Sequence, residues 1–72
     1  MTIMANQAEQ LARIGCNIEI PANTGYLANQ VENIIRIASS RGAHVTVHAG
    51  RYLPNQLEHF ARIGRDKVTI VL

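Results

Sequence analysis

His44 and His48 are the side chains best suited to chemistry, because an imidazole can exchange protons near neutral pH and can bind metals. They are the first and last residues of the segment 44–48, whose alternation of polar and apolar residues predicts a strand. Four residues along a strand span roughly 13 Å, which is too far for both rings to hold one ion. The third histidine, His59, falls in a predicted helix, and we therefore expect no metal site.

The loop after His48 could bind an anion or a small ligand. Arg51 could hold a carboxylate or phosphate through two parallel hydrogen bonds, and His48 could act as an acid or base. Ligands of open α/β sheets bind beyond the carboxyl ends of the strands, where residues 48–52 and 21–24 would meet. A simple connection between two elements explains the same residues.

Cys16 is the only cysteine, so it has no disulfide partner within the chain. A lone cysteine usually behaves as a small buried hydrophobe, and the sequence places no group to activate this thiol. The five acidic residues are scattered without a spaced pair. We therefore expect a protein that is not an enzyme and that needs no cofactor.

Three helix-like stretches each end in glycine and lead into a short alternating run. Glycine suits the left-handed conformation that commonly terminates a helix. Pro54 is favoured in the first turn of a helix, and Asn23 or Thr24 could cap the helix before it. The predicted helices cover residues 3–14, the stretch from the 21–25 loop to about residue 40, and residues 54–64; the predicted strands cover residues 17–20, 44–48 and 67–71.

Residues at helical spacing predict the buried face of each helix. The predicted inward residues are Ile3, Gln7, Leu11 and Ile14 in the first helix, with Ala8 beside them; Leu27, Val31, Ile34, Ile35 and Ala38 in the second; and Leu57, Phe60 and Ala61 in the third.

These elements predict a two-layer α/β fold, in which a short parallel three-stranded sheet carries all its helices on one face. Strands separated by helices lie parallel, and a parallel strand covered on both faces would be continuously apolar. The first two strands instead keep one polar face, which favours the strand order 1-2-3. The order 2-1-3, with helices on both faces, is the alternative that the apolar Val71 favours. The polar residues expected on the uncovered face are Glu19, His44, Thr46 and His48, beside Lys67.

A short internal echo suggests a repeat. Glu9–Gly15 matches Glu58–Gly64 at five of seven positions, whereas the middle unit does not share this sequence. The match suggests a stacked α/β repeat.

The 72 residues predict one domain, residues 1–72, and a domain of this size is marginally stable by itself. We expect self-association to supply the additional stability, because the sequence contains neither a pair of cysteines for a disulfide nor a set of metal ligands. The C-terminal strand is the expected contact, since Thr69, Ile70 and Val71 are uncharged and suited to pairing with another chain. A symmetric dimer with a six-stranded sheet would protect this edge, and truncation of a larger repeat protein would explain the same feature.

The sequence favours a small non-enzymatic protein–protein interaction module, a homo-oligomer that also binds a protein partner. Its candidate binding residues are Glu19, His44, Thr46, His48, Arg51 and Tyr52. Two alternatives stay open: a small-ligand or acid–base site at residues 48–52, and nucleic-acid or polyanion binding, for which a net charge of +2 is weak support. The arginines that would serve polyanion binding are Arg36, Arg41, Arg51, Arg62 and Arg65. Neither a signal peptide nor an apolar run of membrane length is visible, so we expect a cytoplasmic protein without membrane contact.

Overall fold

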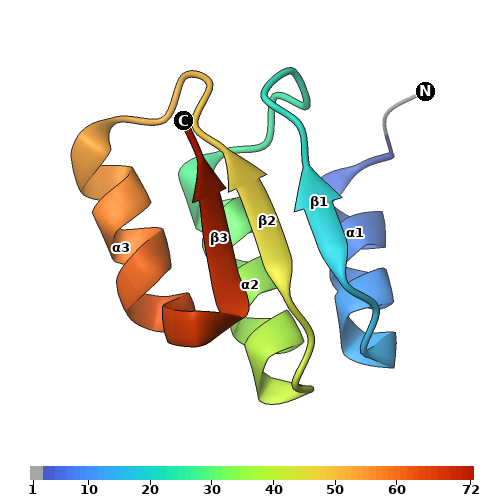
Figure 1. Ribbon diagram of the computed structural model, residues 1–72. Coiled ribbons are helices and arrows are strands. Elements are labelled where there is room, and N and C mark those ends of the chain that lie inside the picture. Colours follow the sequence, from blue (N-terminus) through green and yellow to red (C-terminus); the bar gives the residue numbers. More distant parts are fainter. Residues whose placement is uncertain (1–2) are drawn as a thin grey trace.

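Helices and strands alternate along the chain, as the sequence predicts, in a computed structural model that describes residues 3–72 (Figure 1). A single 3₁₀ turn, Arg65–Lys67, joins the last helix to the last strand. The elements are α1 (Ala5–Ile14), β1 (Ile18–Ile20), α2 (Ala28–Ser40), β2 (Val45–His48), α3 (Pro54–Gly64) and β3 (Val68–Val71).

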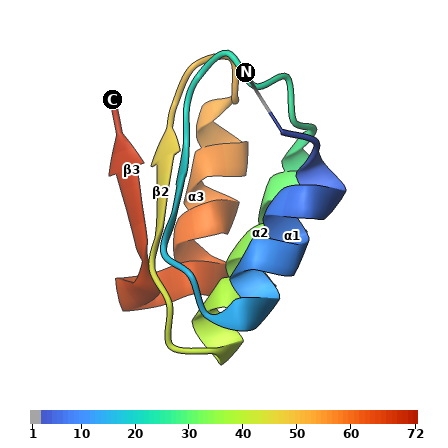
Figure 2. The same cartoon turned by 90° about the vertical axis from the view of Figure 1, so that its right-hand side faces the viewer.

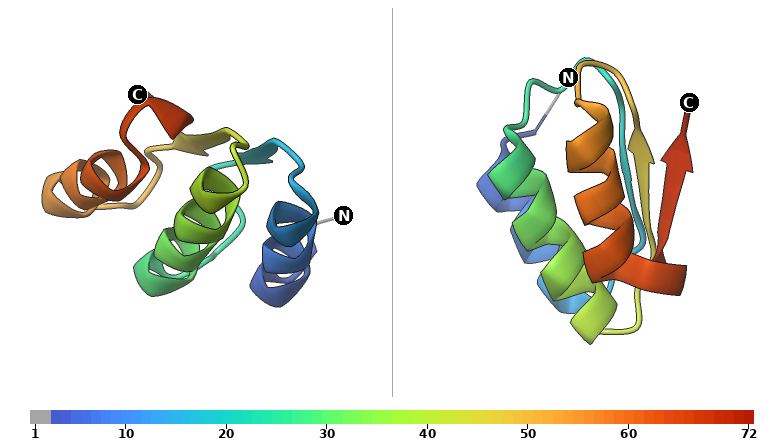
Figure 3. Two further views of the ribbon diagram at one scale, coloured as in Figure 1. Left: turned by 90° about the horizontal axis from the view of Figure 1, so that it is seen from below. Right: turned by 90° about the vertical axis from the view of Figure 1, so that its left-hand side faces the viewer.

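The three strands form one parallel sheet in the order β1-β2-β3. All three helices pack on the same face of this sheet, and the opposite face carries no helix (Figure 2). Seen from the end, the helices stand in a row in chain order behind the strands (Figure 3). The predicted two-layer α/β fold and the order 1-2-3 are therefore confirmed, and the order 2-1-3 is wrong.

The core is aliphatic and is centred on α2 and β2. In α2, Val31, Ile34, Ile35 and Ala38 are fully buried, as predicted, whereas the prediction for Leu27 is wrong because Leu27 is the N-cap and is 63% exposed. Phe60 from α3 is the largest fully buried side chain. The middle unit is covered by a neighbour on each side, which explains why its apolar residues are the most completely buried.

The predicted inward face of α1 is right for Ala8 but wrong for the large residues. Ala8 and Ala12 are buried, whereas Ile14 is 80% exposed and Leu11 is 41% exposed. Because α1 is the terminal helix of the row, only its alanine face has a helix beside it, and the large side chains point elsewhere. In α3, similarly, Phe60 is buried as predicted but Ala61 is exposed.

The three helices start in the same unusual way, which the prediction of Asn23 or Thr24 as a cap missed. Each N-cap is an apolar residue that has no side-chain oxygen to offer the helix amides. A glutamine three residues later accepts the N-cap amide instead, through its Oε1 at 2.8–2.9 Å. This is one half of a capping box. The pairs are Met4 with Gln7, Leu27 with Gln30, and Leu53 with Gln56.

Aligning the helices on these N-caps reveals a repeat in all three units, including the middle one. We call the aligned segments Met4–Gly15, Leu27–Ala38 and Leu53–Gly64 the helix motif. Its glutamate and arginine form the same ion pair in each helix, at 3.7–3.8 Å. The residues shared by all three copies are Asn6, Asn29 and Asn55; Gln7, Gln30 and Gln56; Glu9, Glu32 and Glu58; Arg13, Arg36 and Arg62; and Ile14, Ile37 and Ile63.

The glycines that end the helices have two different roles. Gly15 and Gly42 have φ angles of +96° and +76°, so both adopt the predicted left-handed conformation. Gly64 has φ −92° and is needed for space instead. A Cβ on Gly64 would lie 2.8 Å from Cβ of Val68 and 2.9 Å from Cγ2 of Ile35.

Within residues 3–72, no helix combines the length and the apolar character needed to cross a membrane.

Candidate functional site

The uncovered face of the sheet carries a ladder of polar residues. Glu19, Thr46 and Thr69 lie opposite one another in the strand register, and successive strand residues alternate between the two faces. We call this surface the front face and define it by Glu19, His44, Thr46, His48 and Thr69.

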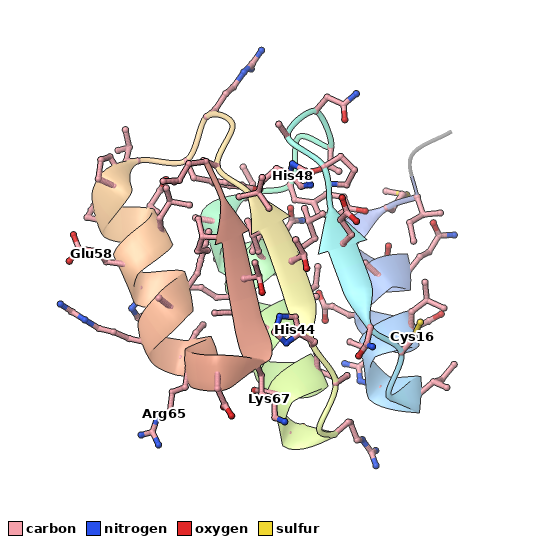
Figure 4. All side chains as sticks on the ribbon, in the orientation of Figure 1. Cys16, His44, His48, Glu58, Arg65 and Lys67 are labelled. Atoms are coloured by element: carbon pink, nitrogen blue, oxygen red, sulfur yellow. The ribbon has the colours of Figure 1, made fainter. Side chains whose placement is uncertain are left out.

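Each front-face histidine bonds a residue of a neighbouring strand. Nε2 of His48 donates to Oε2 of Glu19 over 2.7 Å, and Nε2 of His44 lies 2.6 Å from Oγ1 of Thr69. His44 lies just before the lower end of β2, and His48 is its last residue, at the upper end (Figure 4). The two rings therefore have different partners and do not form one site.

Lys67 does not join Glu19 and His48 in the cluster that the sequence predicts. It precedes β3 at the end of the sheet opposite His48, close to Arg65 in Figure 4. The register explains this separation, because His48 lies opposite Val71 and Val68 lies opposite Val45.

A shallow depression of about 370 Å³ opens on the front face between β1 and β2. Glu19 and Thr46 line it together with His44. At its lower end Asn17 extends the pairing of the strands, because its Oδ1 accepts the backbone amide of His44 at 2.8 Å. The depression offers polar groups from two strands, in a shape that an extended segment or a side chain of another protein could contact.

The two loops beyond the carboxyl ends of β1 and β2 meet, as predicted. A Cβ on Gly50 would lie 2.9 Å from Cβ of Ala22 and 3.2 Å from its Cα and carbonyl oxygen, so the two loops approach closely at Gly50. Arg51 is exposed there and lines a hollow of about 360 Å³ with Asn23. Only Arg51 in this hollow carries a charge, so the rim lacks the several converging polar groups typical of a small-ligand site.

Tyr52 has a structural role rather than an open binding position. Its hydroxyl donates to the carbonyl oxygen of Tyr26 over 2.8 Å, and its ring packs edge-to-face on Phe60 with centroids 5.4 Å apart. Burial raises the pKa of Tyr52 above its usual 10.0.

The same bond occurs between the first two units. The hydroxyl of Tyr26 donates to the carbonyl oxygen of Ile3 over 2.6 Å, and burial also raises the pKa of Tyr26. Each tyrosine thus bonds the residue before the N-cap of the preceding helix motif. The phrase Tyr-Leu-x-Asn-Gln, which occurs at 26–30 and 52–56, is the sequence signal that could have identified this tyrosine ladder.

The C-terminal strand lies at an edge of the sheet, as predicted. The carbonyl oxygen of Val71 accepts the amide of Ala49, which ties β3 to the β2 side. Thr69 and Val71 are exposed and Ile70 is half-buried. The residues expected to mediate self-association therefore lie on an accessible strand.

The arginines considered for polyanion binding are spread over the molecule. Arg36 and Arg62 pair with a glutamate one turn earlier in their helices. Arg41 and Arg65 follow the ends of helices, whereas Arg51 lies in a loop beyond the opposite end of the sheet. This distribution does not concentrate positive charge on one surface.

His59 and Cys16 stay outside the front face. Nε2 of His59 lies 3.1 Å from Oε1 of Glu32 on the neighbouring helix, and Cys16 is exposed rather than buried. Among residues 3–72, no group of three or more histidine, cysteine or acidic side chains is placed to hold a metal ion.

No protein-family model, curated protein or solved structure matches this chain.

Proposed function

We propose that this chain is a small non-enzymatic protein–protein interaction module that binds a protein partner on its front face and associates with itself through an edge strand. The observation that supports this most strongly is the uncovered parallel sheet with its polar ladder. A sheet face without helices offers a broad surface that rigid strands hold in place.

The chemistry of the front face favours a polar partner surface. Glu19 supplies a carboxylate, His44 and His48 supply imidazoles, and Thr46 and Thr69 supply hydroxyls. Four of these five groups are held by two hydrogen bonds between strands, at 2.6 and 2.7 Å, so few rotamers are lost when a partner binds. Small binding modules gain affinity from such preorganised groups.

The test is capture of a protein from the native cell by the immobilised chain and by two variants. Thr46→Arg places a bulky charge in the centre of the front face, and Asn33→Arg places the same charge on an exposed position of α2. We expect one captured protein to be retained by the wild type and by Asn33→Arg, but lost with Thr46→Arg. Equal capture by both variants would contradict the proposed surface.

The proposal includes a cytoplasmic location, on the sequence grounds given above. Fractionation of native cells tests it, with recovery in the cytoplasmic fraction as the expected outcome and recovery in another compartment as the contrary one.

A further inference from the structure

The first unit exposes a position that is buried in the other two. Leu11 of α1 corresponds to Ile34 of α2 and to Phe60 of α3 in the helix motif. Leu11 is 41% exposed, whereas Ile34 and Phe60 are 0% exposed. The side chain at this position is therefore covered only where another unit precedes it.

The last unit shows the complementary gap. Ala12 of α1 and Ile35 of α2 are 0% exposed, whereas the corresponding Ala61 of α3 is exposed. Cγ2 of Ile35 would lie 2.9 Å from a Cβ on Gly64, so this position faces the following unit. The two ends of the molecule thus expose the two halves of one interface.

We propose that copies of this chain stack head to tail, with α1 and β1 of one copy packing against α3 and β3 of another. The inference rests on the proposed self-association and specifies its geometry. Leu11 of one copy covers Ala61 of the other, and the free edge of β1 pairs in parallel with β3. A depression of about 300 Å³ beside β1 receives the second copy, and its apolar lining includes Ile3, Leu11, Ile18 and Ile20.

A second copy is the occupant because this interface already occurs twice within the chain. In the sheet, Ile18 pairs with Val45 and Val45 with Val68, so the next step places Ile18 of the second copy opposite Val68. In the helix row, His59 of α3 bonds Glu32 of the preceding helix. The next step places Gln10 of the second copy opposite Glu58 of the first copy. Neither step brings like charges together.

The joint between copies lacks one bond that the internal joints have. Ile3 stands where Tyr26 and Tyr52 stand in the other units, so it has no hydroxyl to donate to the carbonyl of Tyr52. Because the interface is heterologous, each added copy leaves a free face at either end of an open stack, so the assembly grows with concentration beyond a dimer.

The decisive experiment is sedimentation velocity on the wild type and on two blocked variants at micromolar concentrations. Leu11→Arg blocks only the first end, and Ala61→Arg blocks only the last. We expect the wild-type mass to rise with concentration beyond a dimer, each variant alone to stay a monomer, and their equimolar mixture to form a dimer. Circular dichroism of each variant checks that it is folded.

Two further variants, designed to change the strength of association, keep the test informative if a blocked variant fails to fold. Ile3→Tyr supplies the missing hydroxyl, and Ile3→Phe supplies the ring without it. One net hydrogen bond corresponds to a roughly 2- to 10-fold tighter association for Ile3→Tyr than for Ile3→Phe.

A strictly monomeric wild type would overturn the proposal. A wild type that stops at a dimer, or a dimer that persists in each blocked variant alone, would overturn it in favour of a symmetric contact. The front-face capture experiment is independent of these outcomes, since Thr46 lies on neither end face.

Discussion

At the residue scale, the tyrosine ladder joins one unit to the next. The hydroxyl of Tyr52 reaches a backbone carbonyl of the preceding unit and satisfies it away from bulk water. Removing one partner of a partly buried hydrogen bond costs more than the bond's net contribution, because the other partner is left unsatisfied. The ladder should therefore be visible in the stability of the protein.

We expect Tyr52→Phe to lower the free energy of unfolding by about 1–2 kcal/mol, because the carbonyl of Tyr26 loses its donor. Urea denaturation followed by circular dichroism measures this difference. His59→Gln serves as the control, since His59 is exposed and its change should stay within about 0.5 kcal/mol. An equally small effect of Tyr52→Phe would show that the ladder adds no stability.

The same tyrosine predicts a dependence of stability on alkaline pH. Burial raises the pKa of Tyr52 above 10.0, so the unfolded chain ionises first. This contribution to stability is complete below pH 10.0 and is lost as the pH rises through the folded pKa. Wild type should lose stability more steeply above that pH than Tyr52→Phe, as measured by urea denaturation across the pH range. Parallel pH profiles would contradict the assignment.

At the element scale, the apolar N-caps contribute little to helix stability and leave a place for improvement. Leu27 is 63% exposed, and its backbone is extended with φ −72° and ψ 156°, which a capping serine also adopts. Gln30 already accepts the N-cap amide, so a hydroxyl at position 27 would complete a capping box.

We expect Leu27→Ser to be more stable than Leu27→Ala by about 0.5–2 kcal/mol, because only serine can accept the amide of Gln30. Thermal unfolding of the two variants measures the difference. Similar stabilities would indicate that α2 begins elsewhere.

Close packing between α3, β3 and α2 gives a second prediction at this scale. Gly64→Ala adds a Cβ within 3 Å of Val68 and Ile35, and an overpacked core typically loses about 1–3 kcal/mol. The better helix propensity of alanine recovers at most about 1 kcal/mol, so we expect net destabilisation.

Val68→Gly supplies the control for this clash, because it removes the Cβ and Cγ1 atoms that would lie 2.8 and 3.0 Å from the added methyl. Denaturation should show that Gly64→Ala costs less in the Val68→Gly background than in the wild type. Purely additive effects would mean that the clash is not the cause.

At the scale of the whole molecule, periodicity predicted the elements, the sheet order and the uncovered face. It succeeded because polar and apolar residues alternate along β1 and β2 and because α2 has neighbours on both sides. The prediction that Leu11 and Ile14 of α1 are buried was wrong because amphipathic spacing does not reveal which side of a terminal helix has a neighbour. Periodicity also did not predict the hydrogen bonds between units, such as that of Tyr52 with Tyr26, because they depend on how two repeats pack against each other.

The middle copy of the repeat was missed for a different reason. Aligning the units on the glycines that end the helices pairs Gly42 with Gly15 and Gly64. The residue that corresponds to those two glycines is Ala38, because α2 continues past that position to Ser40. Comparison from the helix starts would have aligned Asn29 and Gln30 with their counterparts. In a stack of this kind the helix start is the invariant landmark, because the preceding loop fixes where each unit begins.

The measurement that tests the uncovered sheet most directly is thiol labelling of single cysteines placed on β2. In a Cys16→Ser background, Thr46→Cys puts the thiol on the front face and Val47→Cys puts it among the helices, where Val47 is 0% exposed. We expect a thiol reagent to modify position 46 in the native state and position 47 only as fast as the protein unfolds. Equal protection of both positions would contradict an uncovered front face, and with it the surface assigned to partner binding.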